Sequence, residues 1–148
     1  IKTVAQQNCN LLLDQFSPGS TVLKRVKIFN NELNSLGLKN RPQIALARAM
    51  YIAKDKNEKK EIILKRLKAR ENIDKLSQRP DGNNKSSIMI HKGTDEDYNG
   101  ALIGTKEEII DRINELKEGG INYIILVDNG GGIKGLDRFA NEIISSIN

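Results

Sequence analysis

The last third of the chain, residues 102–147, constrains the fold most, because both ends of a helix can be located in it. Thr105 and Glu108 have the spacing of a capping box. In that motif the hydroxyl accepts from the N–H three residues on, and the carboxylate accepts from the N–H of the first residue. A helix is therefore predicted to begin at Lys106. The Gly-Gly pair at 119–120 can adopt the left-handed conformation that ends helices, so this helix is predicted to stop there.

Apolar segments flank this predicted helix on both sides. Residues 102–104 precede it, and residues 121–127 follow it as an almost unbroken apolar run. Such runs are typical of parallel strands covered on both faces. A further helix is predicted between Leu136 and Ile147. The stretch is therefore predicted to form a βαβ unit followed by a helix.

The same alternation is predicted upstream. Residues 11–13 form a short apolar run that indicates a buried strand, and an amphipathic helix is predicted from Ser20 to Gly37. Residues 43–53 alternate between bulky side chains and alanines with a period of two, which indicates a strand. A basic helix capped by Asp55 follows, reaching about Ser77. Four successive βα units favour an α/β fold, either a small open parallel sheet or half of an eight-stranded barrel.

Length and composition restrict the class of protein. A chain of 148 residues is expected to form a single domain. The net charge of +5 comes with interleaved acidic residues and few aromatic ones, so we expect a solvated surface and no nucleic-acid partner. No apolar stretch approaches the ~18 residues of a membrane span. The single cysteine, Cys9, lies in an apolar helical pattern and is expected to be buried, in a cytoplasmic protein.

Polar residues follow two of the predicted strands. Asp14 and Gln15 come after residues 11–13, and Asp128 and Asn129 come after residues 121–127. Ligand-facing residues of parallel α/β folds gather at the carboxyl ends of strands, so these four are the candidate cofactor-binding residues. For Asp14 and Gln15 the alternative is that they cap the loop. The glycines at 130–132 could cradle a phosphate or could be a flexible connection.

Arg48 and His91 are two further residues whose roles can be predicted from the sequence. Arg48 shares its parity with the bulky residues of its predicted strand, and a buried charge must be compensated. A structural ion pair or a contact with an anion or cofactor would do so. His91 is the only histidine, and no cluster of histidines and cysteines accompanies it, so no metal site is expected and no catalytic residue is assigned.

The pattern resembles the C-terminal part of bacterial-luciferase-like flavin monooxygenases. The resemblance rests on Ile103-Gly104-Thr105-Lys106-Glu107-Glu108, on Gly119-Gly120-Ile121 before the last strand, and on Leu136-Asp137-Arg138-Phe139-Ala140. Lys106 stands where that family often has proline. Residues 4–15 look like the family's fifth strand with its preceding helix, and residues 48–55 look like its sixth strand and the element after it.

This resemblance implies the C-terminal half of a (β/α)8 barrel that holds a flavin at the carboxyl ends of its strands. The cofactor would be FMN, with F420 as the alternative, and the substrate a small molecule. Residues 78–100 would be a mobile loop over that substrate. Because other family residues precede the matching part, the chain is expected to be a fragment that is inactive alone, pairing with a missing N-terminal half or forming a homo-oligomer.

An alternative of a different class remains open. The chain could be a non-catalytic α/β module that binds a protein partner. Its sheet edges, or the basic helix that ends near Ser77, would supply the contact. Binding of FMN or F420 separates the two hypotheses.

Overall fold

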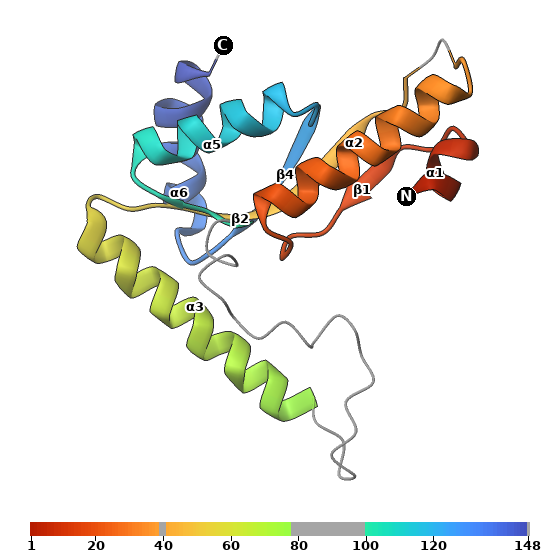
Figure 1. Cartoon of the computed structure of the whole chain (residues 1–148). Coiled ribbons are helices and arrows are strands. Elements are labelled where there is room, and N and C mark those ends of the chain that lie inside the picture. Colours follow the sequence, from red (N-terminus) through yellow and green to blue (C-terminus); the bar gives the residue numbers. More distant parts are fainter. Residues whose placement is uncertain (39–40, 78–99, 148) are drawn as a thin grey trace.

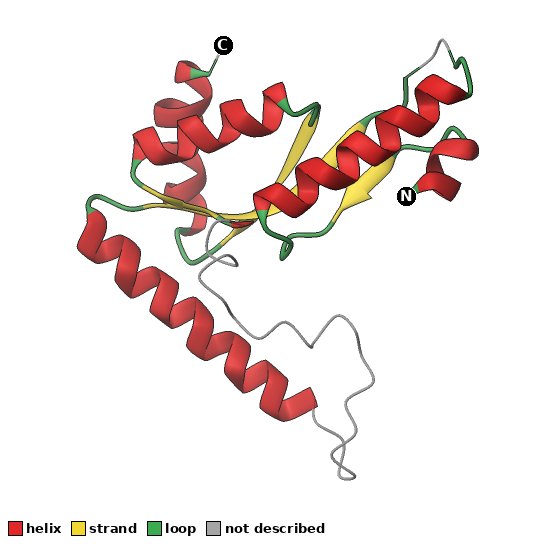
Figure 2. Ribbon diagram, viewed as in Figure 1, coloured by secondary structure: helices red, strands yellow, loops and turns green. Residues whose placement is uncertain are grey.

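The structure is a computed structural model of the chain, and it describes residues 1–38, 41–77 and 100–147. Strands and helices alternate in it, as Figures 1 and 2 show. The elements are α1 (Lys2–Gln6), β1 (Leu11–Leu13), α2 (Gly19–Ser35), β2 (Ile44–Ile52), α3 (Lys56–Ser77), β3 (Leu102–Gly104), α5 (Lys106–Glu118), β4 (Tyr123–Asp128) and α6 (Gly132–Arg138). A π-helical turn (Phe139–Ile143) and a 3-10 turn (Ile144–Ser146) continue α6.

The nine-residue β2 is the centre of a parallel four-stranded sheet. β1 pairs with its first residues, with Leu11 opposite Ile44, and β3 pairs with its last residues, with Leu102 opposite Met50. Residues 45–50 of β2 pair with β4 on the other edge. β1 and β3 therefore share one edge of β2, one after the other, and β4 occupies the opposite edge alone.

The strand order differs from the chain order expected for an arc of a barrel. In a barrel β4 would pair with β3, but here both pair with β2. β3 has only three residues, whereas the pairing of β4 with β2 extends over six residues. As a consequence α3 lies on the face of the sheet opposite to α2 and α5, as Figure 1 shows. Ile62 and Ile63 of α3 pack there against a cluster that includes Ile103.

Most of the core lies between the sheet and the helices α2 and α5. The apolar stripe predicted for α2 is confirmed at Val22, Val26, Phe29 and Leu33, which are buried, but its last member, Leu36, is 44% exposed beyond the end of the helix. They pack against the residues of β1 and β2 that point to this face. Ile109 and Ile113 of α5 and Phe139 of the C-terminal helical turns form a second cluster beside it. These two clusters fix the sheet against one helical layer.

The predicted boundaries of α5 and the predicted start of α3 are confirmed, whereas the last helix begins at Gly132, before the predicted Leu136. The capping box is present, with the Thr105 hydroxyl accepting from the Glu108 N–H and the Glu108 carboxylate accepting from the Thr105 N–H at 3.1 Å. Gly120 has φ of +97°, the left-handed conformation expected after α5. The Asp55 carboxylate accepts from the N–H groups of Asn57 and Glu58 at 2.9 Å, so it caps α3 as predicted.

Two burial predictions were wrong. The strand at 121–127 was expected to be covered on both faces, but Tyr123, Ile125 and Val127 are 60%, 40% and 39% exposed. The α3 helix covers only the carboxyl end of their face, around Ala49 and Ile103. Cys9 is exposed rather than buried, because α1 ends at Gln6 and the cysteine lies in the turn beyond it.

The loop expected over residues 78–100 lies outside the described residues, apart from Gly100, and so does His91. In the described parts of the chain, no helix has the length and apolar character needed to cross a membrane.

Candidate functional site

The four candidate residues all lie at the carboxyl end of the sheet. Asp14 and Gln15 begin the β1–α2 loop, and Asp128 and Asn129 lead into the β4–α6 loop. The two pairs do not meet, because β1 and β4 lie on opposite edges of β2. β1 also ends opposite Leu46, whereas β4 ends opposite Met50, so the two loops leave the sheet at different levels.

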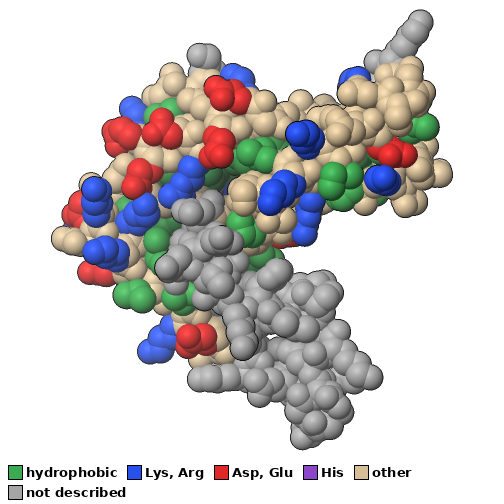
Figure 3. All heavy atoms as spheres, viewed as in Figure 1, with side chains coloured by type: hydrophobic (Ala, Val, Ile, Leu, Met, Phe, Trp, Pro, Cys, Tyr) green, Lys and Arg blue, Asp and Glu red, His purple; other side chains and the backbone are tan. Residues whose placement is uncertain are grey.

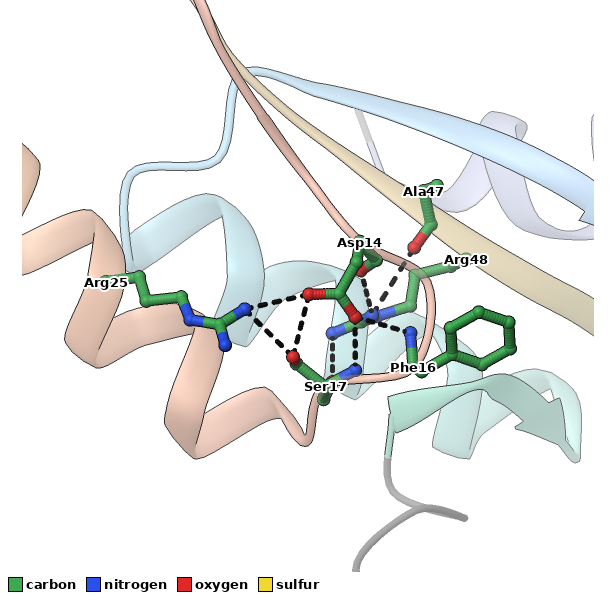
Figure 4. Close-up of polar contacts among 6 residues, drawn as sticks. All are labelled: Asp14, Phe16, Ser17, Arg25, Ala47 and Arg48. Atoms are coloured by element: carbon green, nitrogen blue, oxygen red, sulfur yellow. Dashed lines mark hydrogen bonds and ion pairs between the residues drawn. The ribbon is translucent and has the colours of Figure 1, made fainter. Parts of the chain in front are cut away.

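Asp14 organises the β1–α2 loop, as Figure 4 shows. One carboxylate oxygen accepts from the N–H groups of Phe16 and Ser17, at 2.8 and 2.7 Å. The other accepts from the Ser17 hydroxyl and from the Arg25 guanidinium, both at 2.8 Å. The loop-capping alternative for Asp14 is therefore what the structure contains. No hydrogen bond of the Gln15 side chain contributes to this arrangement.

These hydrogen bonds fix the ionisation of Asp14. Partial burial raises its pKa, but the bonds from Ser17, from the Phe16 N–H and from Arg25 outweigh burial and hold the pKa at about 2. Asp14 is consequently a carboxylate at neutral pH and cannot serve as a general acid there.

Arg48 fills the gap on the edge of β2 between the end of β1 and the start of β3. Its side chain is 1% exposed. The guanidinium donates to the carbonyl oxygens of Asp14 at 3.0 Å and Ser17 at 2.9 Å, and more weakly to that of Ala47 at 3.3 Å. The hydrogen bonds thus go to backbone carbonyls, whereas the sequence suggested an ion pair or an anion. Burial lowers the pKa of Arg48 to about 10, which leaves it charged at neutral pH.

The glycine turn after β4 is occupied by the chain's own carboxylate. Asp128 accepts from the N–H groups of Gly131 at 2.9 Å and Gly132 at 3.1 Å, and from Gly130 at 3.2 Å. These bonds lower the pKa of Asp128, with the bond from Gly132 the largest cause. Gly130 and Gly132 have positive φ, which orients the amides toward one point. A phosphate can use these amides only by displacing Asp128.

Asn129 links this turn to α3. Its amide oxygen accepts from the Arg66 guanidinium at 3.1 Å, and its N–H donates to the Met50 carbonyl. Beside it lies a cleft of about 220 Å³ between the end of β2 and α6, with Lys134 and Arg138 on its wall. Arg138 is held by Glu142 and by the Ile52 carbonyl. The cleft therefore carries positive charge next to the Asp128 turn.

The sequence did not indicate the partners of these residues. The charge pattern predicts a solvated surface, but Arg25 binds Asp14 and Arg66 binds Asn129. Lys59 likewise contacts both carboxylate oxygens of Glu108 at 2.9 Å. Only the contact of Asp14 with the Phe16 N–H had a usable signal, since aspartate side chains commonly accept from the backbone N–H two residues on. Long-range partners leave no such pattern in the sequence.

Several donors at the carboxyl edge that could hold the phosphate of FMN or F420 are already engaged, although Lys134 lines the neighbouring cleft. Both cofactors carry phosphate, which needs amide or cationic donors that are not otherwise engaged. The amides of the glycine turn bind Asp128, and the buried Arg48 binds carbonyls. Within residues 1–38, 41–77 and 100–147 no group of three histidines, cysteines or carboxylates could hold a metal. The carboxyl edge can position a ligand, but further residues are needed to enclose one.

Comparison with known proteins identifies the fold. No protein-family model matches the sequence, and no curated protein is significantly similar to it. The structure resembles monooxygenase RslO1 from Streptomyces bottropensis, with 18% identity and a TM-score of 0.63 over 99% of this chain. It also resembles an F420-dependent secondary alcohol dehydrogenase (16%, 0.59) and the coenzyme F420-dependent tetrahydromethanopterin reductase from Methanopyrus kandleri (17%, 0.61), again over 99% of the chain.

The resemblance to the luciferase-like barrel proteins expected from the sequence is confirmed at the level of the fold. The chain has the α/β fold of about half of each of these proteins. It spans only 44–48% of the length of these solved structures. All three are named as oxidoreductases, and two of the three names specify F420.

Proposed function

We propose that this chain is the C-terminal half of a barrel oxidoreductase that uses F420 or FMN to act on a small molecule. The observation that carries the proposal is the match of 99% of the chain to about half of each of three oxidoreductases. Fold alone does not define activity, so the proposed activity must also be supported by the residues at the carboxyl edge of the sheet. Ligands of parallel α/β folds bind at that edge.

We assign each candidate residue a distinct part in this site. Asp14 and Asp128 hold the two loops, because their carboxylates are used by loop amides, a hydroxyl and Arg25. Gln15 and Asn129 then present side-chain amides at the carboxyl ends of two separate strands, where each contacts the cofactor from its own edge of the sheet. The cofactor supplies the redox chemistry when bound, and these residues orient it. The rest of the site belongs to polypeptide outside this chain.

A binding experiment tests this function. The chain alone, and a version extended through any coding sequence upstream of Ile1, are titrated with F420 and with FMN by calorimetry. We expect binding by the extended protein and none by the chain alone, because the described residues leave too few donors for phosphate. In the extended protein, Gln15→Ala and Asn129→Ala are each expected to weaken binding about tenfold, as loss of one hydrogen bond in a closed site does.

Gln43→Ala is the matched control for Gln15→Ala. Gln43 is exposed at the amino end of β2, the opposite end of the sheet, so its loss should leave cofactor affinity unchanged. Binding of neither cofactor by either protein contradicts the proposed function. That result favours the non-catalytic module that binds a protein through its sheet edges or α3.

A further inference from the structure

Arg48 is the only buried charged side chain among those that the structure describes. On the face drawn in Figure 3, basic and acidic side chains are interspersed at the surface, where water stabilises their charges. The guanidinium of Arg48 instead lies in the interior and donates to neutral carbonyls. A buried charge without a hydrogen-bonded ion pair is costly to the fold, so this arrangement indicates a role for Arg48 beyond packing.

Arg48 holds the β1–α2 loop on both sides of Gln15. Its guanidinium donates to the carbonyl of Asp14, one residue before Gln15, and to that of Ser17, two residues after it, as Figure 4 shows. The Asp14 carboxylate in turn accepts from the N–H groups of Phe16 and Ser17. Two charged side chains therefore fix two carbonyls and two amides of the backbone around Gln15.

Two further elements hold the same loop. From α2, the Arg25 guanidinium donates to the Asp14 carboxylate at 2.8 Å and to the Ser17 hydroxyl at 2.9 Å. Before β3, Gly100 lies so close that a Cβ on it would be 3.1 Å from the Ser17 carbonyl oxygen and 3.4 Å from that of Phe16. The loop is thus held from β2, from α2 and from the segment that leads into β3. A loop held in this way loses little conformational freedom when a ligand binds to it.

We propose that Arg48 is a positioning residue, which fixes the β1–α2 loop so that the Gln15 side chain meets the cofactor in one orientation. This role rests on the proposed function, because Gln15 is placed at the cofactor there. Arg48 acts through the loop and does not touch the ligand, since its side chain is buried and its hydrogen bonds go to carbonyls. Binding to an ordered loop costs less conformational entropy than binding to a mobile one, so cofactor affinity should report the contribution of Arg48.

A double-mutant cycle on the extended protein, measured by calorimetry with F420 and with FMN, tests this role. We expect Arg48→Met to weaken cofactor binding about tenfold, as Gln15→Ala does. The double variant should show the same loss of about tenfold, because both changes remove one contact. Arg48→Lys keeps a donor for one carbonyl and should bind with intermediate affinity. Gly100→Ala displaces the same loop without removing the charge, and should weaken binding only while Gln15 is present.

Ile113→Ala is the matched control for a general loss of stability. Ile113 is buried in a cluster that contains no residue of the β1–α2 loop. This variant should be destabilised but should keep its cofactor affinity. Without cofactor, amide hydrogen exchange at Phe16 and Ser17 should be about tenfold faster in Arg48→Met than in Ile113→Ala, because only Arg48→Met opens the loop locally.

The contrary outcomes can be told apart. If Arg48→Met and Gln15→Ala act independently, the double variant loses about a hundredfold in affinity, and the positioning role is overturned. Equal exchange of the loop amides in Arg48→Met and Ile113→Ala overturns it too. Binding of neither cofactor by the wild-type extended protein contradicts the proposed function itself, and faster exchange in Arg48→Met would then assign Arg48 to the stability of the loop alone.

Discussion

At the scale of single residues, Asp14 and Arg48 together shape one loop. Asp14 binds the amides and the hydroxyl of the β1–α2 loop, and Arg48 binds its carbonyls. The two charged groups thus satisfy both the donors and the acceptors of a loop that sits in the gap between β1 and β3. Arg48 is tolerated in a strand that is otherwise apolar because its buried guanidinium donates hydrogen bonds to the loop carbonyls.

Replacing Asp14 by Asn should lower stability in a pH-dependent way. The pKa of Asp14 is about 2 in the folded chain, below its ordinary value of 3.8. The stabilisation is therefore fully present above pH 3.8 and is lost as the pH falls through about 2. Because the side chain is 43% exposed, we expect roughly 1 kcal/mol at pH 7 after allowance for solvent screening.

Urea unfolding at pH 7 and at pH 3 measures this effect. The difference between the wild type and Asp14→Asn should shrink at the lower pH. Asp137→Asn, an exposed position on α6, should show no such change. A difference of constant size at both pH values would show that the Asp14 carboxylate does not stabilise the loop.

Replacing Arg48 by Met should destabilise the fold by about 2–4 kcal/mol, because two buried carbonyls lose their donor. Arg48→Lys should cost less, since one ammonium can still reach one of the carbonyls. Lys24→Met, at an exposed position on α2, is the control and should be nearly neutral. Urea denaturation followed by circular dichroism gives all three values. Equal stabilities for Arg48→Met and the control would be incompatible with the role assigned to the guanidinium.

At the scale of elements, the junction between β3 and α5 also makes a contact with a third element, α3. Glu108 both completes the capping box and binds Lys59 of α3. The Glu108 carboxylate therefore contacts helices on opposite faces of the sheet. The pKa of Glu108 is lowered, and the hydrogen bond from Lys59 is the largest cause.

Gly104→Ala should disrupt this junction. A methyl group at Gly104 would lie 2.5 Å from a carboxylate oxygen of Glu108, which must move away from Thr105 and Lys59. We expect a loss of about 1–2 kcal/mol, the cost of a cap. In a Glu108→Ala background the same substitution should cost much less, and thermal unfolding of the four variants gives the coupling. Gly19→Ala, with open space around it, is the control. Equal costs in both backgrounds would place the strain elsewhere.

The elements were largely predictable from the sequence, whereas their order in the sheet was not. Caps such as Thr105 with Glu108, and the stripe of α2, depend on neighbours within a few residues, so spacing reveals them. The position of β4 depends on competition between the edges of β2 and β3, which spacing does not encode. For the same reason the sequence placed Asp14 and Asp128 at strand ends but not their partners, and Arg48 was recognised as buried without its carbonyl acceptors.

At the scale of the whole molecule, the nine-residue β2 holds the sheet together, because β1, β3 and β4 all pair with it.

The central position of β2 also has a consequence for how the chain reaches its native state. β1 meets it across about 33 residues of chain, whereas β4 meets it across 78. The β2–β4 contact therefore carries the larger loop-closure entropy, and it forms only after the polypeptide between the two strands has been arranged. Until then β2 has one unpaired edge and the nascent chain has an incomplete nucleus. We therefore expect the pairing of β4 to be among the last steps of folding, which pulse-labelling hydrogen exchange of the β2 and β4 amides would measure.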